Sequence, residues 1–246
     1  MKSNKHFWYW MLPLMVIIPL IAMYFSGVKW AMELVCPTVN WELGIVENLQ
    51  LLVILLIFAI SLMGIRRKDL KLEKFALGFL AFFALFVFLE EIDYGLHYVE
   101  YFKGESNTLF RDVTGSKNLH NMGNNARLFK RSIYPLMALL FIIGPLYAHK
   151  IKHSLIQYLT PSKAIVFTAI ITIFSYLVPR LLVDWNIFPD GGFKRNIGEF
   201  SELMVYYIFF VYLYEIIFEK RYLTRAQLDS IDQEEDLAYE PTQNIE

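Results

Sequence analysis

Cysteine is almost absent from this chain of 246 residues, which contains only Cys36. A single cysteine cannot form an internal disulfide, and it excludes a metal site built from several cysteines. Charged residues are also scarce, at 19% of the chain against about a quarter in soluble domains. The formal net charge of -1 argues against a nucleic-acid-binding protein, which would present a basic face. The GxGxxG, P-loop and serine nucleophile-elbow motifs are likewise absent.

Hydrophobic residues make up 56% of the chain and aromatic residues 17%, with a mean hydropathy of +0.40. They are gathered in long runs, each able to cross a hydrocarbon core of roughly 30 Å at about 1.5 Å per helical residue. The sequence therefore predicts an all-α fold, a polytopic membrane helix bundle of about six transmembrane helices in a lipid bilayer. The predicted spans are Trp8–Ser26, Leu43–Gly64, Phe75–Tyr98, Ser132–His149, Ala164–Trp185 and Gly198–Phe218.

The distribution of charge between the spans predicts the topology. Basic residues crowd the short loop after the second span, the loop before the fifth span and the segment after the sixth. By the positive-inside rule, both termini lie in the cytoplasm, and we expect a bacterial inner or plasma membrane. Residues 1–226 form the transmembrane domain with an extracytoplasmic loop at 100–131, and residues 227–246 form a disordered acidic cytoplasmic tail. The first span is expected to be an uncleaved anchor, because no clear small-x-small cleavage site follows it.

Acidic residues within the spans are the least expected feature, since each costs about 2.5–3.5 kcal/mol at the centre of a membrane helix. Counting from the cytoplasmic basic residues places several of them at one depth, near the outer boundary. Glu215 and Glu219 lie instead at the cytoplasmic boundary beside Lys220, where snorkelling explains them. Four different helices thus contribute to one outer polar layer, which consists of Glu47, Glu90, Glu91, Arg180, Glu199 and Glu202.

The spacing of residues along the third span extends this layer. Glu90, Asp93 and His97 recur at three and four residues and would share one helix face. His120, in the long outer loop, could fold down over the layer as part of a lid. Carboxylates that share a poorly hydrated layer repel one another unless arginine, protonation or a bound cation offsets the charge. All three offsets remain open.

A metal-dependent hydrolase of a lipid-like substrate is the leading functional hypothesis. In it, Glu90 or Asp93 acts as general base and Arg180 binds an anionic head group. The metal would be zinc, iron or manganese, and it would activate a water molecule. Its ligands would be Glu47, Glu91, His120, Glu199 and Glu202.

The polar layer is also compatible with roles that involve no catalysis. Its groups could be hydrated or paired with arginine at the interface and only hold helices together. The protein could be an accessory or scaffold subunit of an envelope complex, with a membrane protein partner bound to the layer. Ion- or proton-coupled transport is a further alternative, although broken spans and a mid-membrane charge pair are absent.

Two short motifs carry a resemblance, Glu90-Glu91-Ile92-Asp93-Tyr94-Gly95 and Asn118-Leu119-His120-Asn121. The chain resembles a group of bacterial multi-pass membrane proteins with Glu-Glu-Ile-Ser/Asp-aromatic-Gly and Asn-Leu-His-Asn segments. The resemblance implies a site that also includes Glu47, Glu199 and Glu202, and it names no reaction. The group's pattern has Trp at the position of Tyr94 and Gln-Arg at Leu96-His97. A looser similarity is to alkaline-ceramidase-like membrane hydrolases, which use acidic and His zinc ligands in a helical bundle of more spans.

Overall fold

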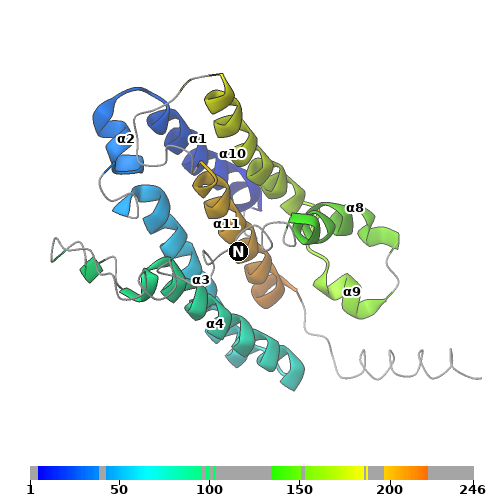
Figure 1. Ribbon diagram of the computed structural model, residues 1–246. Helices are drawn as coiled ribbons and strands as arrows, with labels where there is room; N and C mark the ends of the chain where they lie inside the picture. Colours follow the sequence, from blue (N-terminus) through cyan, green and yellow to red (C-terminus); the bar gives the residue numbers. More distant parts are fainter. Residues whose placement is uncertain are drawn as a thin grey trace, which may run out of the picture.

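The computed structural model describes residues 5–38, 43–95, 98, 99, 102, 134–150, 153–185, 187 and 197–220 (Figure 1). Within these ranges the chain is helical and contains no strand. The predicted tail at 227–246 lies outside the described residues, and so does the predicted outer loop at 100–131 apart from Phe102. The all-α fold class is confirmed.

Five long apolar helices form the bundle, with lengths of 18 to 23 residues and mean hydropathies of 1.5 to 2.4. At about 1.5 Å per residue, each can cross a hydrocarbon core of roughly 30 Å. The chain is therefore an integral membrane protein. The five helices are η1 (Phe7–Met11) continued by α1 (Leu12–Tyr24), α3 (Ile45–Arg67), α4 (Lys71–Glu91), α10 (Ile165–Asp184), and α11 (Glu199–Tyr214) continued by η6 (Glu215–Glu219).

The remaining helical elements are shorter than these five. A continuous helical stretch at 134–150, here called the 134–150 helix, includes η4 (Leu139–Ile143), α8 (Gly144–Tyr147) and η5 (Ala148–Lys150). The other three are α2 (Lys29–Val35), η3 (Asp93–Gly95) and α9 (Ser154–Leu159).

Five of the six predicted spans are confirmed, with shifted ends. The third was expected to reach Tyr98, but α4 ends at Glu91 and the backbone then turns. The predicted span Ser132–His149 corresponds to the 134–150 helix, whose described part is slightly shorter than the five long helices.

Helix α3 packs against α4 on one side and α11 on another, while α11 also contacts α10 and α1 (Figure 1). The core between them contains fully buried Tyr24, Ile54, Phe200 and Ile208. Because lipid tails are as apolar as these side chains, their close fit stabilises the bundle through van der Waals contact.

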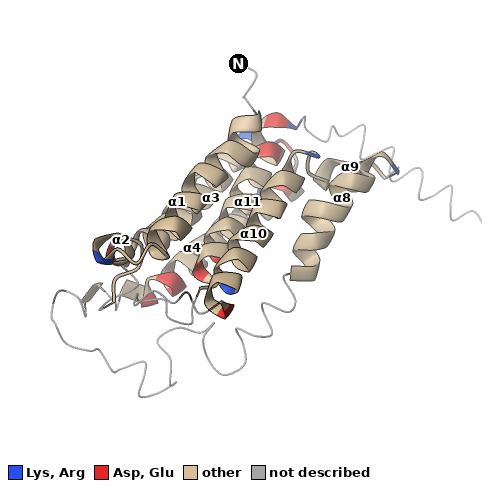
Figure 2. Ribbon diagram, turned by 90° about the horizontal axis from the view of Figure 1, so that it is seen from above, with Lys and Arg blue, Asp and Glu red and all other residues tan. Residues whose placement is uncertain are grey.

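Charged residues gather at the two ends of the bundle, and the middle of the long helices is free of them among the described residues (Figure 2). The "carboxylate end" contains the first turns of α3 and α11 and the last turn of α4. The "basic end" contains Arg66 and Arg67 in the last turn of α3, Lys68 directly after it, and Lys220 after η6. Lys5 forms an ion pair of 2.7 Å with Glu219, so the N-terminal segment and the end of the last helix lie at the same end. The assignment of that end to the cytoplasm stays a prediction.

Gly44 allows the start of α3 to lie against the end of α2. A Cβ atom at this position would overlap the carbonyl oxygen of Val35 and meet the Cα atom of Cys36 at 3.0 Å. We therefore expect Gly44→Ala to lower the free energy of unfolding by about 1–3 kcal/mol through overpacking. Denaturant unfolding in detergent micelles would measure the change.

Gly78→Ala is the matched control, because its added Cβ would meet only Ile65 Cδ1, at 3.9 Å. Alanine also stabilises a helix interior by about 0.5–1 kcal/mol relative to glycine. Equal effects of the two substitutions would show that the contact between α2 and α3 does not need Gly44.

Candidate functional site

Three helices bring carboxyl groups together at the carboxylate end. Glu47 lies in the first turn of α3, Glu91 is the last residue of α4, and Glu199 and Glu202 lie in the first turn of α11. Acidic groups favour the first turn of a helix, because the helix dipole is positive there. The charges of Glu91, Glu199 and Glu202 all act on Glu47, so the four side chains form one electrostatic group. We call these four residues the carboxyl cluster.

Burial distinguishes the members of the carboxyl cluster. The residues Glu47 and Glu199 are only 7% and 6% exposed, whereas Glu91 and Glu202 are half-buried. The Oε1 atom of Glu47 is buried and has no hydrogen-bond partner among the described residues. A buried carboxyl oxygen without a partner loses the hydrogen bonds that water would give it, so it is a place where a ligand or water could bind.

Two neutral side chains orient the carboxyl cluster. Gln50, one turn below Glu47, is fully buried, and its Nε2 donates to the backbone oxygen and Oε2 of Glu199 at 3.1 and 3.2 Å. Tyr206, on α11, donates its hydroxyl proton to Oε1 of Glu91 at 2.7 Å. These bonds connect α3 to α11 and α11 to α4, so they hold the carboxylates at defined positions.

The end of α4 differs from the prediction. Asp93 and Tyr94 have φ angles of 48° and 55°, and Gly95 follows with 86°. The left-handed region costs a residue other than glycine about 1–2 kcal/mol, so this turn is strained and ends the helix. Glu90 and Asp93 therefore do not share a helix face as predicted, since Asp93 is past the end of α4. His97 lies outside the described residues.

The turn nevertheless keeps two predicted site residues inside the protein. Glu90 and Asp93 are both 3% exposed, and Glu90 accepts a hydrogen bond from the Tyr94 hydroxyl. This bond to a carboxylate raises the pKa of Tyr94 to about 12. The hydrogen bond from Tyr94 thus holds the Glu90 side chain against the turn that ends α4.

Arg180 is not part of the buried site. Its side chain is 57% exposed on α10 and pairs with Asp184, one turn further along, with Nε and Oδ1 3.3 Å apart. Its depth in the membrane stays a prediction, and its side chain projects from the surface of α10. The structure therefore gives Arg180 no role beside the carboxyl cluster.

The predicted metal ligands do not form a metal centre by themselves. Among the described residues, no group of three or more His, Cys, Asp or Glu side chains is arranged to hold a metal ion. His120, the proposed imidazole ligand, lies outside those residues. The described part of the site thus offers acid–base groups rather than a preformed zinc, iron or manganese site.

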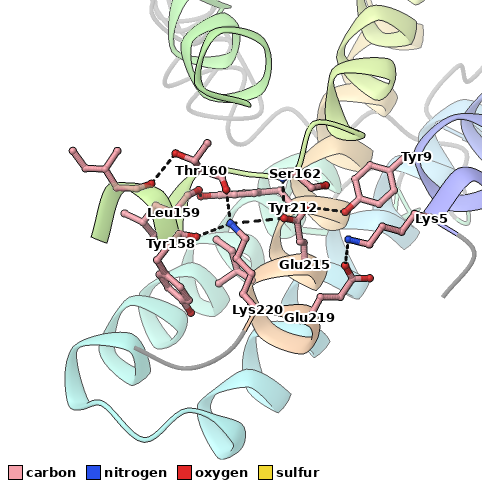
Figure 3. Close-up of polar contacts among 12 residues, drawn as sticks. Lys5, Tyr9, Tyr158, Leu159, Thr160, Ser162, Tyr212, Glu215, Glu219 and Lys220 are labelled. Atoms are coloured by element: carbon pink, nitrogen blue, oxygen red, sulfur yellow. Dashed lines mark hydrogen bonds and ion pairs between the residues drawn. The ribbon is translucent and has the colours of Figure 1, made fainter. Parts of the chain in front are cut away.

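A second polar network, at the basic end, surrounds Glu215 (Figure 3). The carboxylate is 2% exposed and accepts hydrogen bonds from the Tyr9 hydroxyl at 2.7 Å and the Ser162 backbone N–H at 2.8 Å. Lys220 Nζ lies 3.7 Å from Glu215 Oε1 and donates to the carbonyl oxygens of Tyr158, at 2.6 Å, and Thr160. Burial lowers the pKa of Lys220, and Glu215 opposes this shift.

Lys68 extends this network beneath α9. It is 1% exposed and donates to the Tyr158 hydroxyl at 2.5 Å and to the Ile216 carbonyl at 2.9 Å. Glu73 pairs with Lys68 at 3.4 Å and accepts the Tyr158 hydroxyl proton at 2.7 Å. Burial, together with Glu73, raises the pKa of Tyr158.

This basic-end network was missed from the sequence, where snorkelling alone accounted for Glu215. Its partners are far apart along the chain, since the residue numbers of Tyr9 and Glu215 differ by 206 and those of Lys68 and Tyr158 by 90. Its hydrogen bonds and ion pairs join the first helix, the turn after α3, α9 and η6, while Glu73 Oε2 and Ser162 Oγ are buried without a hydrogen-bond partner among the described residues. The network is therefore structural.

Comparisons with protein-family models, curated proteins and solved structures found no match to this chain. The resemblance to bacterial proteins with Glu-Glu-Ile and Asn-Leu-His-Asn motifs accordingly stays a prediction. The function has to be inferred from the geometry of the two ends of the bundle. The carboxylate end gathers like charges beside Glu47 Oε1, a buried oxygen without a hydrogen-bond partner among the described residues.

Proposed function

We propose that the carboxyl cluster is the active site of a membrane-embedded hydrolase that acts on a lipid-like amphiphile. The observation that carries the proposal is the gathering of Glu47, Glu91, Glu199 and Glu202 from three helices into one electrostatic group. Burying several carboxyl groups together costs folding free energy, so a purely structural role would be served better by apolar residues.

The chemistry follows from the side chains present. A carboxylate can accept a proton from a water molecule while that water attacks the substrate. A protonated carboxyl group can donate a proton to the leaving group. The half-buried Glu91 and Glu202 are the members best placed to reach a substrate, while Glu47 and Glu199 are enclosed behind them. Tyr206 orients Glu91 and could stabilise negative charge on the substrate.

The substrate class follows from the location. The carboxyl cluster lies at the end of apolar helices that span the bilayer, so its substrate would reach it along the membrane. An amphiphile with a polar bond near the lipid–water boundary meets that requirement. The resemblance of the motif at Glu90–Gly95 to that of bacterial membrane proteins is compatible with an amphiphilic substrate, but it does not indicate which reaction takes place.

An activity screen of the purified protein in lipid vesicles tests the proposal. Ester, amide and phosphodiester lipids would be supplied in turn, and their products measured by mass spectrometry. We expect one class to be cleaved, and Glu91→Gln to slow the cleavage by about 10²–10⁴-fold, the usual contribution of a general acid or base.

Glu33→Gln is the matched control for this screen. Glu33 belongs to α2, and its two oxygens accept hydrogen bonds from the Thr38 backbone N–H and hydroxyl; in glutamine the amide oxygen can accept from the N–H and the amide NH2 can donate to the hydroxyl. Those bonds hold the pKa of Glu33 below its usual value, so its carboxylate serves the local turn. Cleavage of no lipid class, or equal rates for Glu91→Gln and the parent protein, would contradict the proposal.

A metal-dependent form of the same site would require a ligand outside the described residues, such as His120. Elemental analysis of the purified protein beside His120→Ala addresses this form directly. Stoichiometric zinc, iron or manganese that is lost in the variant would establish it.

A second candidate, an accessory subunit of a membrane complex, is favoured by the exposed surface of α4. This helix buries Leu77, Ala81 and Ala84, whereas Phe75, Phe79, Phe82, Phe83 and Phe86 are exposed. A partner helix could pack on these rings in place of lipid. Co-purification of one stoichiometric partner, lost on replacing Phe79 and Phe82 by leucine, would support this role over the hydrolase.

A further inference from the structure

A lateral crevice of about 440 Å³ opens between the 134–150 helix, α10 and α11. Its floor is buried and includes Met137, Phe141, Ala169, Thr172 and Ser201. Its rims are exposed and include Tyr134, Ile173, Tyr176 and Leu177. The crevice therefore faces the surroundings of the bundle, which for these helices is the bilayer.

The two hydroxyl groups on the floor of the lateral crevice both donate their protons to backbone carbonyl oxygens of their own helices. Thr172 donates its hydroxyl proton to the Thr168 carbonyl at 2.9 Å, and Ser201 donates to the Gly198 carbonyl at 2.7 Å. The rest of the floor is hydrocarbon and aromatic ring. Apolar cavities of this kind stay dry and take up apolar ligands.

The small residues of the lateral crevice also indicate a ligand. Ala138, Ala169 and Ser201 face it from three different helices. Small side chains at membrane helix interfaces normally let the helices approach closely. Here they border open space instead, so another group has to supply the van der Waals contacts that a neighbouring helix would give.

The length of the lateral crevice matches a lipid chain. It extends along the 134–150 helix from Tyr134 to Ile142, about 12 Å at 1.5 Å per residue. The depth is close to one leaflet of a hydrocarbon core roughly 30 Å thick, which suits one hydrocarbon chain.

We propose that the lateral crevice binds one hydrocarbon chain of a membrane lipid, whose head group lies at the carboxylate end. The orientation follows from Ser201 and Tyr134, which line the crevice near the start of their helices at that end. Ser201 and Val205 lie about 110° around α11 from Glu199, Glu202 and Tyr206, at about 100° per residue. The lateral crevice is thus separate from the carboxyl cluster, and the inference goes beyond the proposed hydrolase.

Photolabelling tests this inference without any turnover. The intact protein is reconstituted into phosphatidylcholine vesicles that contain a phosphatidylcholine with a diazirine in one acyl chain, and labelled peptides are mapped by mass spectrometry. We expect Ile142 and Leu177 to be labelled more strongly than the exposed Phe79 and Phe82 of α4. Glu91→Gln should label like the parent protein, which separates this result from any failure of the hydrolase proposal.

Variants that fill the space complete the test. Ala138→Phe and Ala169→Phe place a ring in the lateral crevice from two walls, and we expect each to reduce labelling of Leu177 about tenfold, equivalent to 1.4 kcal/mol of binding free energy. Ala76→Phe, on the exposed face of α4, is the control and should change nothing. Labelling of the crevice no stronger than that of α4, or unchanged in a filled variant that keeps its unfolding midpoint, would overturn the inference. If neither filled variant folds, the comparison with α4 in the parent protein decides alone.

Discussion

Lys68→Met is expected to lower the free energy of unfolding by about 3–5 kcal/mol, the cost of removing one partner from a buried ion pair. Methionine fills a similar volume, so the loss reports charge and hydrogen bonds rather than a cavity. Glu73 would lose its cation, and the Tyr158 hydroxyl and the Ile216 carbonyl would lose a donor. Chemical denaturation in detergent micelles, followed by tryptophan fluorescence, would measure the change.

Lys71→Met is the matched control for Lys68→Met. Lys71 begins α4 three residues later and is exposed, so its replacement should change stability by less than about 0.5 kcal/mol. The double variant Lys68→Met/Glu73→Gln should recover part of the loss, because it removes both charges of the pair. Equal losses for Lys68→Met and Lys71→Met would mean that the basic-end network does not hold the bundle together.

Gln50→Leu is expected to lower the free energy of unfolding by about 1–3 kcal/mol, because buried acceptors are left without a donor. Leucine is close to glutamine in size but cannot donate to the backbone oxygen and Oε2 of Glu199. Because Gln50 is fully buried, water cannot replace its amide. The same denaturation measurement applies, and the variant should also slow any cleavage that depends on the carboxyl cluster.

Asn48→Leu is the control on the same helix. Asn48 is exposed, and its amide bonds only to the nearby carbonyl oxygens of Leu43 and Gly44. Its replacement should cost less than about 0.5 kcal/mol. If both substitutions had the same effect, the bond from Gln50 to Glu199 would not be what positions α3 against α11.

The carboxyl cluster and the lateral crevice use two faces of α11 at the same end of the bundle. A lipid chain in the crevice would bring a head group near the first turn of α11, where Glu199 and Glu202 begin the helix. Chain labelling and lipid cleavage can therefore be measured independently on the same set of variants. If both succeed, the crevice would be one route by which an amphiphile approaches the site.

The order and depth of the helices were determined by the sequence alone. Hydropathy marks where a chain can cross a bilayer, and a rise of about 1.5 Å per residue converts sequence distance into depth. Glu47, Glu91, Glu199 and Glu202 could for this reason be assigned to one layer before any contact was known. That layer exists, and its members act on one another.

The rotation and neighbours of each helix were decided only by the tertiary structure. Arg180 projects from the surface of α10, and α4 ends at Glu91 because the next residues turn into the left-handed region. The basic-end network joins residues as distant as Tyr9 and Glu215. The position of a residue along a helix can be counted from the sequence. The lateral position of a helix depends on how side chains from all helices pack together, and hydropathy does not encode that packing.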